Sequence, residues 1–236
     1  MKPLLYWDGD RRLAGPLELM KFTLTFDGDL PSSGNKSKPE AASRIRNAFH
    51  HQLAELWESH VILRQLARTA RTSYQGEFRV SADYSPASLS DFRGSIPDLM
   101  DGQTDLCGRI DIAKIGSFIP LVRQSLYLAC SVDVLFLRHE DPLNLMKQGG
   151  DLDGRIKTLF DGMTMPVAGS GYKGEKPTAD PLYVVLEDDA FISDISIRTG
   201  RLLGKSANEK HAVKLTVDVT VKVLRVFEQN LCLVGG

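Results

Sequence analysis

Apolar and polar residues follow regular patterns along several stretches of this 236-residue chain, and these patterns predict its secondary structure. The two types alternate from Met20 to Phe26 and again, without interruption, from Val213 to Val223. Such alternation is typical of strands with one buried face, and the longer stretch suggests an antiparallel, half-exposed strand. Further strands are predicted at Ser117–Val122, Leu126–Leu137, Leu182–Leu186 and Asp194–Arg198.

Two other stretches have the spacing of amphipathic helices. The first follows Ser37-Lys38-Pro39-Glu40, which has the form of a capping box. Its apolar stripe consists of Ile45, Phe49, Leu53, Leu56 and Trp57. The second helix is predicted over residues 151–163, with Leu152, Ile156, Leu159, Phe160 and Met163 on one face. The order of strands and helices predicts one α+β domain, an α/β arrangement with a mixed sheet flanked by helices.

Composition excludes several classes of protein. Hydrophobic residues make up 42% of the chain, charged residues 25%, and the net charge is −1. These values are typical of a globular protein and exclude a disordered or histone-like chain. No apolar stretch reaches the roughly 18 residues of a membrane span, and charges between Asp8 and Glu18 interrupt any signal peptide. The three cysteines, Cys107, Cys130 and Cys232, are widely spaced and lack the spacing of zinc ligands, so we expect reduced thiols in a cytoplasmic protein. Because no membrane span is predicted, we also expect no membrane association.

Acidic residues gather at the ends of two predicted elements. Asp151 and Asp153 begin the second helix, and Asp188 and Asp189 follow a buried-type strand. Mg²⁺ prefers carboxylate and water oxygens, and two such ions stabilise both the attacking and the leaving oxygen in phosphodiester hydrolysis. We therefore hypothesise that these four carboxylates form a metal site. Lys157, one turn after Asp153, could bind a phosphate oxygen or stabilise developing charge.

A structural interpretation of the same acids stays open. Carboxylates at a helix start are favoured by the helix dipole, so capping accounts for Asp151. Asp153 and Lys157 could form a solvated ion pair contributing only about 0.3–0.5 kcal/mol. Acids after a strand are often simply a turn.

The spacing of these residues resembles a known family. The pattern Asp-x-Asp-x-x-x-Lys-x-x-x-Asp, followed by a strand ending Leu-x-Asp-Asp, resembles RusA-type Holliday-junction resolvases. The matching residues are Asp151, Asp153, Lys157, Asp161, Leu186, Asp188 and Asp189. The resemblance implies a small prokaryotic or phage α/β homodimer that cuts four-way DNA junctions with Mg²⁺, or Mn²⁺, in recombination and repair. It implies metal binding by Asp151, Asp153 and Asp189 with Asp188, a catalytic or DNA-contacting Lys157, and a structural Asp161.

The chain departs from the family pattern in three ways. Gly154 stands where the family usually has Asn, Gly150 stands before the first Asp where the family often has a basic residue, and the chain is longer than typical members. The motif covers residues 149–194, whereas residues 28–115 have no match. We therefore expect a single RusA-like domain over the whole chain, with a helical and loop insertion at 28–115 and a core at 116–227.

Charge is sorted along the chain. Residues 36–79 hold eight Lys or Arg and four Glu (8 − 4 = +4), and residues 148–194 hold four bases and nine acids (4 − 9 = −5). A basic surface would follow the phosphates of DNA, although an ordinary solvated helix face accounts for the first segment equally well. Candidate DNA contacts are Arg44, Arg46, Arg155, Lys173 and Lys176.

These observations support three hypotheses. The leading one is a Mg²⁺-dependent, structure-selective endodeoxyribonuclease acting on branched DNA as a homodimer, whose two-fold symmetry would match paired cuts. The second is a catalytically inactive DNA-binding or assembly protein with the same fold, suggested by Gly154. The third is a structural interaction module without a nucleic-acid role, in which the acids are turns and caps.

Overall fold

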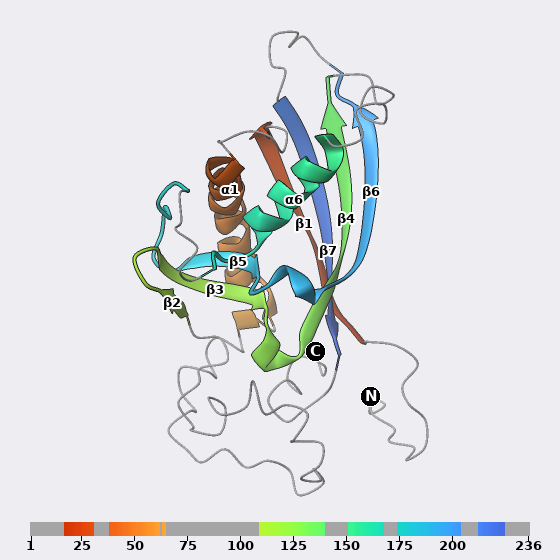
Figure 1. Ribbon diagram of the computed structural model, residues 1–236. Coiled ribbons are helices and arrows are strands. Elements are labelled where there is room, and N and C mark those ends of the chain that lie inside the picture. Colours follow the sequence, from red (N-terminus) through yellow and green to blue (C-terminus); the bar gives the residue numbers. More distant parts are fainter. Residues whose placement is uncertain are drawn as a thin grey trace, which may run out of the picture.

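The computed structural model has an α+β fold in which two helices pack against each other and against the larger of two mixed sheets (Figure 1). It describes residues 17–30, 38–61, 63–64, 109–139, 151–167, 174–203 and 212–224. The predicted fold class is confirmed, but the strands divide into two sheets instead of one. Half of the predicted insertion, residues 65–108, lies outside the described residues, as do residues 31–37 and 62.

The larger sheet has the strand order β1-β7-β4-β6. Its strands are β1 (Leu17–Asp29), β4 (Leu128–Arg138), β6 (Ile192–Arg201) and β7 (Ala212–Val223). β7 is antiparallel to both neighbours, and β4 is parallel to β6. The alternation predicted for β7 is confirmed, because Val217 and Val219 are fully buried while Lys214 is exposed.

The smaller sheet has the order β2-β3-β5. It consists of β2 (Ile110–Ile112), β3 (Gly116–Val122) and β5 (Leu182–Leu186), and β3 is parallel to β5. Two short 3₁₀ helices, η1 (Gln124–Leu126) and η2 (Asp189–Phe191), precede β4 and β6. β5 therefore leads through the acidic residues and η2 directly into the edge strand of the larger sheet.

Helices α1 (Lys38–Ser59) and α6 (Asp151–Met163) pack against each other and share a core with the larger sheet. Ile45, Phe49 and Leu53 of α1 are buried, and Trp57 is only 7% exposed. The start of the predicted insertion is therefore a core helix, because its apolar stripe covers α6 and the sheet. Among the described residues, no helix has the length and apolarity needed to cross a membrane.

Candidate functional site

Helix α6 carries the first acidic motif on its exposed side. The helix begins at Asp151 and ends at Met163, as predicted, and its apolar face is buried around Leu159. Asp153 and Lys157 are both exposed, and within the described part of the chain no ion pair or hydrogen bond engages either side chain. The ion pair that a structural interpretation requires is therefore not formed. The side chain of Asp151 is not among those that the structure describes.

The acids after β5 differ in what they do. The Glu187 carboxylate accepts a hydrogen bond from the backbone N–H of Gln124 at 2.9 Å. Asp188 caps η2 by accepting from the N–H of Ala190 at 2.8 Å. Asp189 is exposed, and no partner engages it among the described residues. A turn accounts for the first two acids and leaves Asp189 without a structural role.

The two acidic groups lie toward opposite ends of α6. Thr164, directly after the helix, forms a bridge with Leu186, and the N–H of Met165 donates to the Leu186 carbonyl at 3.0 Å. The end of β5 is thus tied to the end of α6, whereas Asp153 lies eleven residues earlier, about 16 Å along the helix axis. Figure 1 shows the first turn of α6 beside the C-terminal end of β4, away from η2. The structure therefore does not bring the predicted metal ligands together.

A metal site is also not completed by the described side chains. In that part of the chain, no group of three or more His, Cys, Asp or Glu residues is placed to hold a metal ion. Among the motif carboxylates that the structure describes, Asp153 and Asp189 make no ion pair or hydrogen bond, and they lie toward opposite ends of α6. We therefore assign no catalytic step to a bound ion.

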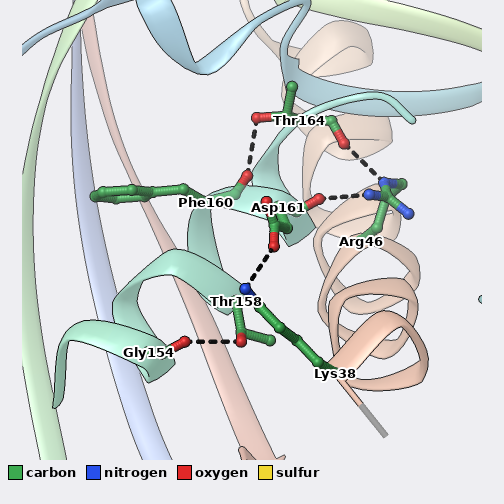
Figure 2. Close-up of polar contacts among 7 residues, drawn as sticks. All are labelled: Lys38, Arg46, Gly154, Thr158, Phe160, Asp161 and Thr164. Carbon is green, nitrogen blue, oxygen red and sulfur yellow. Dashed lines mark hydrogen bonds and ion pairs between the residues drawn. The ribbon is translucent and has the colours of Figure 1, made fainter. Parts of the chain in front are cut away.

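Two arginines predicted to contact DNA are instead buried between elements. Arg155 is 2% exposed and donates from Nη1 to the carbonyl of Leu30. Arg46 is 6% exposed and donates from Nε to the Thr164 carbonyl at 2.9 Å and from Nη2 to the Asp161 carbonyl (Figure 2). A cation at the carbonyl end of a helix is favoured by the helix dipole. We assign both arginines to the packing of α6, which corrects the predicted role.

The remaining candidate DNA contacts lie on the surface or outside the described residues. Arg44 is 3.9 Å from the Glu175 carboxylate, and its side chain is 40% exposed. Lys176 is exposed, and Lys173 lies outside the described residues. These positions leave the prediction open for Arg44 and Lys176.

Asp161, the last carboxylate of the motif, joins the two helices. Its carboxylate is 3.3 Å from the ammonium group of Lys38 in α1, and both residues appear in Figure 2. Earlier in the same helix, the Thr158 hydroxyl donates to the carbonyl of buried Gly154 at 2.9 Å. Asp161 therefore has a contact within the fold that Asp153 lacks.

An aromatic cluster that the sequence analysis did not identify fixes β5 against α1. The Nδ1 atom of His50 accepts from the N–H of Tyr183 at 2.9 Å, and the two rings stack with centroids 5.7 Å apart. Tyr183 also stacks on Trp57 at 5.8 Å. Burial lowers the pKa of His50, and neighbouring His51 lowers it further. The available signal was the position of His50, one turn after Arg46 and next to Phe49 on the buried side.

Comparison with known proteins gives no match: no family model, no curated protein and no solved structure is similar to this chain. The resemblance to RusA-type resolvases therefore depends on the motif residues and their spacing.

Proposed function

We propose that this protein is a Mg²⁺-dependent endonuclease that acts on branched DNA such as four-way junctions. The observation that supports this function is that some motif residues make contacts within the fold, whereas others make none among the described residues. Asp161 and Asp188 are engaged by Lys38 and by a backbone N–H, whereas Asp153, Lys157 and Asp189 are exposed and unengaged within the described structure. The nuclease motif accounts for their spacing, whereas no hydrogen bond or ion pair among the described residues does.

The chain's own groups suggest distinct roles at the first turn of α6. Lys157 is exposed one turn after Asp153, and in this proposal its ammonium group contacts a phosphate oxygen near that carboxylate. Asp153, with Asp151 at the helix start, would supply oxygen ligands of the type that Mg²⁺ prefers. A bound cation would neutralise the repulsion between these carboxylates and a polyanionic substrate.

Cleavage of a synthetic four-way junction in Mg²⁺ or Mn²⁺ tests this function. We expect Asp153→Asn and Asp189→Asn each to lower the cleavage rate by about a hundredfold or more, since even residues behind metal ligands cost 10–100-fold. Glu58→Gln is the matched control, because Glu58 is an exposed carboxylate of α1, outside residues 149–194. Equal cleavage by the wild type and all three variants would exclude the proposed site.

A second candidate is a DNA-binding or assembly protein that keeps this fold without turnover. The distance between the two acidic groups favours it, as does Gly154 in place of the family's Asn. Tight junction binding without cleavage in either metal would support this candidate. Cleavage gained on Gly154→Asn would identify the glycine as the cause. Because Gly154 is buried, that variant must be compared with the wild type for thermal stability as well.

A further inference from the structure

Among the described residues, strand β6 is an edge strand of the larger sheet, with no further strand beside it. It is the last strand in the order β1-β7-β4-β6, and its ten residues contain neither Pro nor Lys. From Asp194 to Arg201 its pairing with β4 is regular. Proteins usually protect such an edge with Lys, Pro or bulges, because unpaired backbone groups are a template for another strand.

The two faces of β6 differ in chemistry. Ile195 and Ile197 pair with Val132 and Val134 of β4, which are buried on the helix side of the sheet. The isoleucines themselves remain 52% and 37% exposed, so α6 does not cover them. The alternate residues Asp194, Ser196 and Arg198 point to the opposite face.

We propose that β6 pairs antiparallel with β6 of a second copy of this chain, with a two-fold axis at Ser196. Two residues then lie directly opposite each other when their residue numbers sum to 392, which is twice 196. Ile195 lies opposite Ile197 of the second copy, and Asp194 lies opposite Arg198. Shifting the axis to Ile195 or Ile197 places Asp194 opposite Ser196 or Gly200, so only the proposed register matches both apolar and charged pairs.

Charges already present on the outer face would extend across this interface. Within one copy, Asp194 is 2.7 Å from the Nζ atom of Lys222, and Arg198 is 3.3 Å from Asp133. Pairing would join them into a row of alternating sign: Lys222 and Asp194 of one copy, then Arg198 and Asp133 of the other. Exposed ion pairs add little affinity, so we expect the charges to set the register and the isoleucines to supply the affinity.

The pairing has a consequence for the acidic groups, and this step rests on the proposed function. β6 begins directly after Asp189, and it runs parallel to β4, whose C-terminal end lies beside the first turn of α6 (Figure 1). Because the paired strands run in opposite directions, Asp189 of one copy lies at the same end of the joined sheet as α6 of the other. The second copy would thereby place Asp153 of one chain and Asp189 of the other at one end of the joined sheet.

Cysteine cross-linking of the full-length chain tests the register. Ser196→Cys places two cysteines opposite each other, with Cα atoms about 4.5–5.5 Å apart, within the range of a disulfide. Mixed Asp194→Cys and Arg198→Cys proteins should cross-link for the same reason. Arg198→Cys alone should not, because its two copies lie about 13 Å apart along the strands. The wild type under the same oxidation measures the background from native cysteines.

Sedimentation equilibrium tests the association itself. We expect a dimer whose dissociation constant rises about tenfold or more in Ile195→Lys, since two symmetric isoleucine pairs are lost. Val61→Lys is the matched control, because Val61 is an exposed apolar residue on another face, 74% exposed. A monomeric wild type, or a dimer that Ile195→Lys leaves intact and Ser196→Cys does not cross-link, would overturn the proposal. Neither readout depends on DNA cleavage. The proposed interface can therefore be contradicted while the nuclease proposal stands, and the nuclease proposal can be contradicted while the interface stands.

Discussion

Arg46 of α1 and Thr164, the residue after α6, are joined by a hydrogen bond of 2.9 Å from the arginine Nε to the threonine carbonyl. Thr164 also bridges to Leu186 at the end of β5. One buried guanidinium therefore holds the point where both helices and the strand before the acidic residues meet. The same guanidinium also satisfies the Asp161 carbonyl, one of the last in α6, which otherwise lacks an intrahelical donor.

Replacing this guanidinium should destabilise the fold strongly. Arg46→Met keeps much of the side-chain volume but leaves two carbonyls without their donor, and we expect a loss of about 2–3 kcal/mol in the free energy of unfolding. Arg44→Met is the control, since Arg44 makes a 3.9 Å ion pair on the surface and should cost less than about 0.5 kcal/mol. Urea unfolding of both variants measures the difference, and equal midpoints would contradict the role assigned to Arg46.

The close approach of α1 and α6 depends on Gly162. A Cβ atom at this position would lie 2.7 Å from both Cβ and Cγ2 of Ile45. Helix propensity favours alanine over glycine by about 1 kcal/mol, but overpacking costs about 1–3 kcal/mol, so Gly162→Ala should be net destabilising. In the double variant with Ile45→Ala, part of the clash is removed, and the two costs should sum to more than the measured total. Additive costs would show that the helices move apart freely.

Much of the fold was predictable from periodicity, whereas the polar contacts between elements were not. The bounds of α6 and the buried face of β7 follow from local spacing, since each pattern reports on a single element. Arg155 falls between Leu152 and Leu159 on the apolar stripe, which is a local sign of its burial. Its partner Leu30 lies far away in sequence, so no local pattern reveals the contact.

The candidate site shows the same division. The motif spacing selected Asp153, Lys157 and Asp189, and the structure gives none of them a contact within its described part. The expectation that both acidic groups converge assumed that β5 returns to the start of α6. The bridge between Thr164 and Leu186 instead sets the strand end at the other end of the helix. A pairing of this kind depends on tertiary packing, which the residue pattern does not encode.

Stability should depend on pH through His50. The Nδ1 atom of His50 accepts a hydrogen bond from the Tyr183 N–H, so the folded state requires the neutral imidazole. Burial lowers the pKa of His50 below its ordinary 6.5. The unfolded chain then takes up a proton first as pH falls. The stabilisation is complete above pH 6.5 and is lost as pH falls toward the pKa of the folded state.

Two variants separate His50 from other titrating groups. His50→Asn keeps an acceptor near Nδ1 without titrating, and we expect it to flatten the dependence of unfolding free energy on pH just below neutrality. His51→Gln should retain most of that dependence, because burial is the larger cause of the His50 shift. Urea unfolding across this range measures both, and an unchanged slope in His50→Asn would assign the effect to another group.

The exposed motif residues should be dispensable for folding. Asp153→Asn and Lys157→Gln remove charges that no contact of the described structure uses, so each should change the free energy of unfolding by less than about 0.5 kcal/mol. The same variants are expected to reduce junction cleavage, and that separation distinguishes a functional surface from a stabilising ion pair. Thermal unfolding and cleavage should be measured on the same preparations. A loss of stability that matches the loss of cleavage would return both residues to a structural role.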